Sequence, residues 1–180
     1  VLGGSFVGTA MPLTVTQILW VNLIMDTFAA MALASLSPSQ EVMTEKPRKQ
    51  NEFIISRKIG GCIFAWGGAF FAILLGLLIY FERDGSVVDT HELTIFFTIF
   101  VMLQFWNLFN AKALGGNKSA LSHITKEKGM ALVLLLIFAG QWMIVTFGGK
   151  MFRTVPLSFT EWATIVAVTS PVLFIGEGIR

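Results

Sequence analysis

The chain has 180 residues, of which 54% are hydrophobic and only 13% are charged, and its mean hydropathy is +0.73. These values exclude a soluble globular domain and indicate a protein that crosses a membrane several times. The single cysteine, Cys62, excludes an intrachain disulfide and a metal site made of several cysteines, and we interpret it as a small packing residue.

Residues 1–11 precede the first apolar span and lack the basic segment that opens a signal peptide. We interpret them as the end of an earlier apolar helix, an N-terminal helix stub, and therefore expect the chain to be a fragment. The first predicted span covers residues 13–34 and ends where Ser35 and Pro38 disfavour a helix.

An acidic residue, Asp26, lies near the middle of this first span. A charged side chain at the bilayer centre costs about 2.5 to 3.5 kcal/mol on insertion scales, so it is tolerated chiefly where it faces a partner, a cavity or an ion. Asn22 precedes it by four residues and is expected on the same helix face. Together they suit a hard cation; alternatively, a protonated Asp26 and Asn22 bind a neighbouring helix through hydrogen bonds.

The second predicted span, residues 59–81, is rich in glycine, and small residues let helices approach closely within a membrane. An acidic connection, residues 82–92, follows it. His91 lies in this connection beside acidic residues and is interpreted as a solvated loop residue rather than as a metal ligand or pH sensor.

The third predicted span, residues 93–111, carries Gln104 and Asn107, which are three positions apart and therefore share a helix face. The fourth, residues 130–147, ends at Gly148-Gly149. Both spans are followed by glycines or basic residues that indicate connections.

The fifth predicted span covers residues 159–176. Ser158 and Glu161 have the spacing of a capping box, in which each side chain binds a backbone amide at the start of the helix. The predicted fold class is therefore all-α: a polytopic membrane helical bundle of five transmembrane helices plus the N-terminal stub.

The positions of the basic residues predict the orientation of these spans. Loops 35–58 and 112–129 contain nine of the 13 Lys and Arg residues. Because cytoplasmic loops carry the excess of basic residues, we expect both loops and the C-terminus to be cytoplasmic.

The chain lacks the motifs of a complete enzyme. Its only aspartates are Asp26, Asp84 and Asp89, and none is followed by Lys-Thr-Gly, as a phosphorylated aspartate of a transport ATPase would be. It also has no Ser-His-Asp or Cys-His set that belongs to one plausible site. We therefore expect no catalysis and no nucleotide binding by this chain alone.

The stretch at residues 12–27, Pro-Leu-Thr-Val-Thr-Gln-Ile-Leu-Trp-Val-Asn-Leu-Ile-Met-Asp-Thr, resembles the sixth transmembrane helix of P-type calcium-transporting ATPases. The resemblance continues along the chain, in the segments 43–48, 54–57, 104–110, 157–162 and 170–172. It implies that residues 1–180 form the C-terminal transmembrane domain of such a pump, helices six to ten, and that the stub is the end of the fifth.

This resemblance implies export of calcium from the cytoplasm, driven by ATP through an aspartyl-phosphate formed elsewhere. ATP and magnesium would act in the missing cytoplasmic domains, and the other partners would be the missing N-terminal helices and the lipid bilayer, with no nucleic acid. Asn22 and Asp26 match the ion ligands that the family has on its sixth helix. The remaining ligands would come partly from the missing fourth helix, so this chain would hold only part of the site.

Two departures from the family pattern bear on the number of ions. Met25 and Gln104 stand where two-site members have a Thr and a Glu that bind the second ion, and this resembles the plasma-membrane calcium pumps. The resemblance implies one calcium per cycle, at Asn22 and Asp26, with Gln104 and Asn107 as peripheral polar groups.

Two other functions remain open on the residues alone. The chain could be a small membrane channel or accessory subunit whose pore is lined by Asn22 and Asp26. It could also belong to a P-type pump for sodium, manganese or protons, because one Asn and one Asp do not select an ion.

Overall fold

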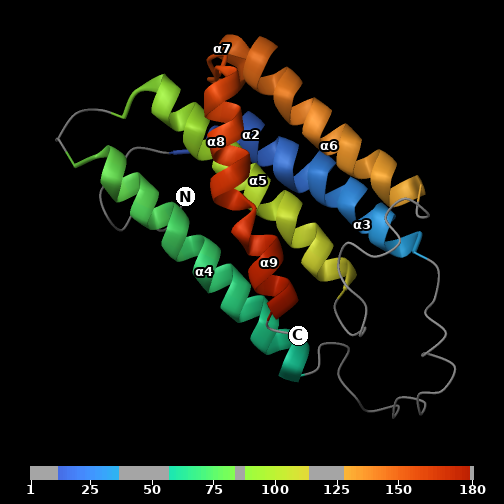
Figure 1. The fold of residues 1–180 in the computed structure, drawn as a ribbon. Coiled ribbons are helices and arrows are strands. Elements are labelled where there is room, and N and C mark those ends of the chain that lie inside the picture. Colours follow the sequence, from blue (N-terminus) through green and yellow to red (C-terminus); the bar gives the residue numbers. More distant parts are fainter. Residues whose placement is uncertain (1–11, 37–56, 84–87, 114–127, 179–180) are drawn as a thin grey trace, which may run out of the picture.

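The computed structural model describes residues 12–36, 57–83, 88–113 and 128–178 (Figure 1). The predicted N-terminal stub and most of the two basic loops lie outside these residues. Within the described ranges the regular elements are all helices and no strand is present, which confirms the predicted fold class.

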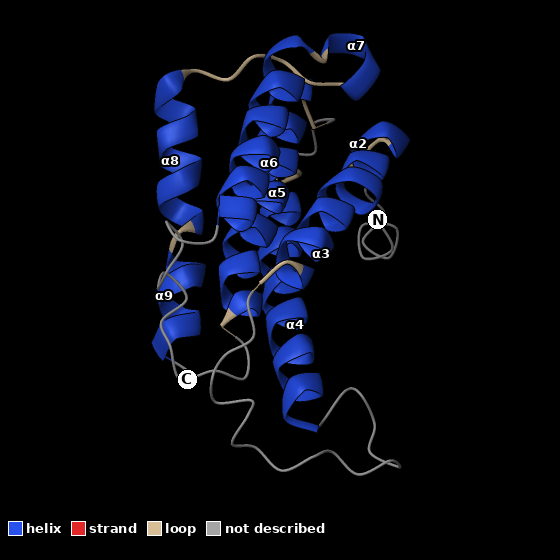
Figure 2. Cartoon of the chain, turned by 90° about the vertical axis from the view of Figure 1, so that its right-hand side faces the viewer, coloured by secondary structure: helices blue, strands red, loops and turns tan. Residues whose placement is uncertain are grey.

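Among the described residues, five helices are long and apolar enough to cross a membrane, as predicted. They are Val15–Ala34, Ile59–Phe81, Thr90–Lys112, Lys128–Phe147 and Phe159–Gly176. They lie roughly along one common direction and form a bundle (Figure 2).

The first span consists of three segments. They are α2 (Val15–Leu19), the π-helical segment η1 (Trp20–Met25) and α3 (Asp26–Ala34). Thr14 caps α2 and forms a capping box with Gln17. The sequence pattern predicts one regular α-helix here, so the π-helical segment is a finding of the structure.

Helix α5 (Thr90–Lys112) occupies the centre of the bundle, where it contacts α4 (Arg57–Phe81), α6 (Lys128–Phe147), α8 (Phe159–Thr169) and α9 (Pro171–Gly178). In its most apolar window 61% of α5 is buried, against 6% for α4. A Cβ at Gly61, Gly67, Gly68 or Gly76 of α4 would meet no atom within 4 Å. The close helix approach expected at these glycines is therefore not found among the described residues, because α4 stands at the edge of the bundle.

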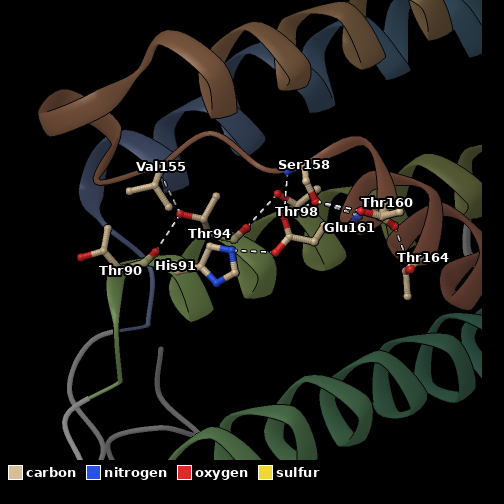
Figure 3. A network of polar contacts seen from close by, with 9 residues as sticks. All are labelled: Thr90, His91, Thr94, Thr98, Val155, Ser158, Thr160, Glu161 and Thr164. Carbon is tan, nitrogen blue, oxygen red and sulfur yellow. Dashed lines mark hydrogen bonds and ion pairs between the residues drawn. The ribbon is translucent and has the colours of Figure 1, made fainter.

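Helix α5 begins three residues before its predicted start. The reason is a capping box in which Asp89 caps the helix and the Glu92 carboxylate accepts a hydrogen bond from the Asp89 amide. His91 consequently lies in the first turn of α5 rather than in a loop. Its Nε2 is 2.7 Å from Oε1 of Glu161, so this pair joins the starts of α5 and α8 (Figure 3).

The connection between α6 and α8 contains the short helix α7 (Gly149–Phe152) and two residues with positive φ, Gly149 and Arg153. Its backbone is attached to α5, because the Val155 amide donates to Oγ1 of Thr94 over 3.1 Å (Figure 3). The predicted capping box of Ser158 and Glu161 then starts α8.

Polar contacts join α5 to the last two helices. Nε1 of Trp106 donates to Oγ1 of Thr169 over 3.0 Å, and Nδ2 of Asn110 donates to the Val172 carbonyl over 3.0 Å. Gly176 of α9 lies directly against the Asn110 amide, so that a Cβ at this position would overlap it. These contacts fix α5 against α8 and α9.

Candidate cation site

Asp26 is the first residue of α3 and directly follows the π-helical segment. Its amide donates to the carbonyl of Val21, five residues earlier, instead of to that of Asn22, as in a regular α-helix. Asn22 and Asp26 line two different cavities.

Asp26 lines a cavity of about 510 Å³ between α3, α4 and α5. The polar side chains in its lining are those of Asp26, Gln104, Asn107 and Asn110. The other lining residues are apolar or small, and they include Met25 and Cys62. The structure thus brings the acidic residue of the first span together with both predicted polar residues of the third.

Asn22 lines a second cavity of about 400 Å³ between the first span, α4 and α5. Its other lining residues are apolar or glycine. Gly67 and Phe70 of α4 line both cavities, which are therefore neighbours. Asp26, Gln104 and Asn107 therefore line one cavity, and Asn22 lines the neighbouring one.

Within the described residues, none of these four side chains forms a hydrogen bond or an ion pair. Other polar side chains of the bundle do have partners, as Gln17 has in the Phe152 carbonyl at 2.8 Å. The alternative function of Asp26 and Asn22, hydrogen bonding to a neighbouring helix, is thus not supported, because neither side chain has a partner in the described part of the chain. Their oxygens are available to a ligand.

Asn110 is a lining residue that the sequence analysis did not include in the site. It is 5% exposed, its Nδ2 is bound to α9, and its Oδ1 has no partner among the described residues. Its position three residues after Asn107, on the same helix face, is the signal that indicates it.

The chemistry of these groups fits a hard cation. Asp26, Asn22, Gln104 and Asn107 offer only oxygen acceptors, which suit calcium, magnesium or manganese, whereas copper and zinc prefer nitrogen or sulfur ligands. The described residues also contain no group of three or more His, Cys, Asp or Glu that could hold a metal. Calcium takes about six to eight oxygens. The Asp26 carboxylate and the Asn22 amide together offer three side-chain oxygens, and Gln104, Asn107 and Asn110 offer one amide oxygen each.

Comparison with known proteins shows the family of this chain. Residues 10–180 match the family described as "Cation transporting ATPase, C-terminus". The human plasma membrane calcium-transporting ATPase 3 is 32% identical over 185 aligned positions, which cover 97% of this chain. The human plasma membrane calcium-transporting ATPase 4 is 33% identical over 187 positions, also with 97% of the chain covered.

A more distant organism provides a third relative. The calcium-transporting ATPase PAT1 of Dictyostelium discoideum is 33% identical over 180 positions, which cover 94% of this chain. The aligned region makes up 15% of the human ATPase 3, 14% of the human ATPase 4 and 16% of PAT1. The chain therefore spans about one seventh of the length of these relatives.

Proposed function

Since the chain belongs to the family of cation-transporting ATPase C-termini, we propose that it is the C-terminal membrane domain of an ATP-driven calcium pump. Its role is to supply part of the calcium site within the membrane and the helices that support this site. ATP and magnesium act in cytoplasmic domains that this chain does not contain. The carboxylate of Asp26, unpaired within the described residues at a cavity that also contains the amides of Gln104, Asn107 and Asn110, is the observation that carries this proposal.

The carboxylate of Asp26 offsets part of the charge of the ion, and Asn22 contributes an amide oxygen from the adjoining cavity. Among the residues that line the two cavities, Asp26 is the only charged one. A divalent cation therefore needs further oxygens and a further negative charge from helices outside this chain.

We propose from the positions of the basic residues which end of the bundle faces the cytoplasm. Lys112 at the end of α5 and Lys128 at the start of α6 belong to one end of the bundle, which also contains the end of α9 (Figure 2). This end continues into the two basic loops and is the cytoplasmic one. The opposite end carries the pair of His91 and Glu161.

We further propose that one calcium is transported per cycle. Met25 is 2% exposed, and its thioether is a poor ligand for calcium. Gln104 lines the cavity of Asp26 but carries no charge that could offset a second divalent ion. Radioactive calcium bound per phosphorylatable site of the full-length protein should be near one, whereas a value near two would contradict this stoichiometry.

The central experiment is Asp26→Asn in the full-length protein. We expect loss of calcium-dependent phosphorylation by ATP, with phosphorylation by inorganic phosphate retained, because removal of the charge weakens ion binding without changing the side-chain volume. Gln104→Ala is the matched control in the same cavity and should have a much smaller effect on calcium dependence. Unchanged calcium affinity in Asp26→Asn would refute the proposed site, and a loss of equal size in Gln104→Ala would give Gln104 a ligand role.

Two other functions are less well supported. A small independent channel does not explain the match of 171 family residues, 10–180, to a segment that forms about one seventh of much longer pumps. A pump for another cation is tested by the ion dependence of phosphorylation, since stimulation by sodium or manganese alone would replace calcium in the proposal.

A further inference from the structure

Trp20 is the first residue of the π-helical segment that separates α2 from α3. Its indole Nε1 donates to Oε1 of Gln141 on α6 over 3.2 Å. Its ring packs directly on Gly140, where a Cβ would lie within 2.9 Å of the ring atom Cζ2. The start of the segment is therefore held from one side by a hydrogen bond and a ring contact with two successive residues of α6.

Gln141 has an unusual environment for a residue with a purely structural role. It is completely buried, and its Nε2 has no partner among the described residues. A buried donor without an acceptor destabilises a fold, so an apolar side chain of similar volume would favour stability at this position. We therefore attribute the presence of an amide at this position to its Oε1, which accepts the hydrogen bond from Trp20.

Among the described residues, the side-chain hydrogen bonds from the first span to α6 and α7 lie at the start of the span, although α3 also packs against α6. Thr16 and Gln17 donate to the carbonyls of Met151 and Phe152, each over 2.8 Å, and Trp20 donates to Gln141. These three hydrogen bonds all precede the turn that carries Asn22 and leads to Asp26. Trp20 makes the last of them, two residues before Asn22.

We propose that Gly140 and Gln141 are positioning residues for the cation site: through Trp20 they hold the π-helical turn in the orientation that directs Asn22 and Asp26 toward the two cavities. Neither residue lines either cavity. They act on the ion only through Trp20. This inference rests on the proposed function, because it assigns a role toward the same site.

The test is a double-mutant cycle in the full-length protein, with calcium as the ligand. Trp20→Phe removes the donor and Gln141→Leu removes the acceptor. Each should raise the calcium concentration for half-maximal phosphorylation by about three- to tenfold, a range that corresponds to about 0.7 to 1.4 kcal/mol. Both changes break the same hydrogen bond. The half-maximal calcium concentration of the double variant should therefore be about the same as that of the more affected single variant. Phosphorylation by inorganic phosphate without calcium should be unchanged, since a role in folding alone would reduce this level.

Gly140→Ala provides an independent perturbation, because it displaces the Trp20 ring without removing either the donor or the acceptor group. It should also raise the half-maximal calcium concentration, which keeps the proposal testable if Gln141→Leu fails to fold. Trp142→Phe is the matched control: it makes the same chemical change on α6, at a side chain that is 48% exposed and has no polar partner among the described residues. It should leave calcium dependence unchanged.

The outcomes separate this inference from the proposed function. Unchanged calcium dependence in Trp20→Phe and Gly140→Ala, while Asp26→Asn abolishes it, would overturn the positioning role alone. Additive effects of Trp20→Phe and Gln141→Leu would also overturn it, because the two residues would then act separately. Calcium dependence that survives Asp26→Asn would overturn the proposed site regardless of the other variants.

Discussion

Replacement of Gly176 by alanine should destabilise the bundle through a single contact. Gly176 of α9 lies against the side chain of Asn110 on α5, and an added Cβ would overlap the amide. Relief of this overlap requires the amide to move away from the Val172 carbonyl, to which it donates over 3.0 Å. Extra volume in a packed core costs about 1 to 3 kcal/mol. Loss of a hydrogen bond between membrane helices adds about 0.6 kcal/mol on average. The expected total is about 1.6 to 3.6 kcal/mol.

The assay is the half-life of phosphorylation competence of the full-length protein in detergent at a fixed temperature, because a large membrane protein unfolds irreversibly. About 1.4 kcal/mol corresponds to a factor of ten, so Gly176→Ala should shorten this half-life at least tenfold. The control is the same substitution in an Asn110→Ala background, where the overlap no longer exists and the further loss should be below about threefold. If Gly176→Ala is equally harmful with and without Asn110, or is harmless in both, the packing argument is wrong.

Three further predictions concern other parts of the chain. Ser158→Ala removes the N-cap of α8 and should cost about 1 kcal/mol, seen as faster thermal inactivation, whereas the exposed Thr164→Ala should stay close to the unmodified protein. Cys62 lines the cavity of Asp26, so calcium should slow the reaction of Cys62 with a maleimide in a full-length protein whose other cysteines are replaced. This protection should disappear in Asp26→Asn, and equal reaction rates with and without calcium would place the ion elsewhere. The 180-residue chain alone should not hydrolyse ATP, and calcium-stimulated phosphate release from the pure fragment would contradict this.

Hydropathy and capping patterns predict the number and approximate limits of the helices. Length and apolar composition are sufficient for this, because every backbone polar group in a membrane must be bound within the helix itself. The capping box of Ser158 and Glu161 is also readable from spacing alone. The earlier start of α5 is readable in the same way, since Asp89 and Glu92 have the spacing of a second capping box.

The arrangement of the candidate site is less predictable. The types and spacing of Asn22, Asp26, Gln104 and Asn107 indicate polar groups in the membrane, but not which of them share a cavity. The π-helical segment has no marker in the sequence such as proline, and the Gln141 partner of its first residue, Trp20, lies 121 residues away along the chain. The position of His91 follows equally from a distant partner, Glu161, and not from its neighbours in the chain.

The π-helical turn also keeps the first span in phase with the bundle. The buried side chains of its first half, Gln17, Val21 and Met25, follow one another at intervals of four, and in a straight α-helix each such step rotates the stripe by about 40° around the axis. A turn that closes over five residues cancels this drift between Val21 and Met25. The register of the whole span thus depends on the one extra residue that the π-helical turn contains. Deletion of a single residue between Trp20 and Met25 would leave composition and hydropathy almost unchanged, yet would rotate everything after it, Asp26 included, by about a quarter of a turn.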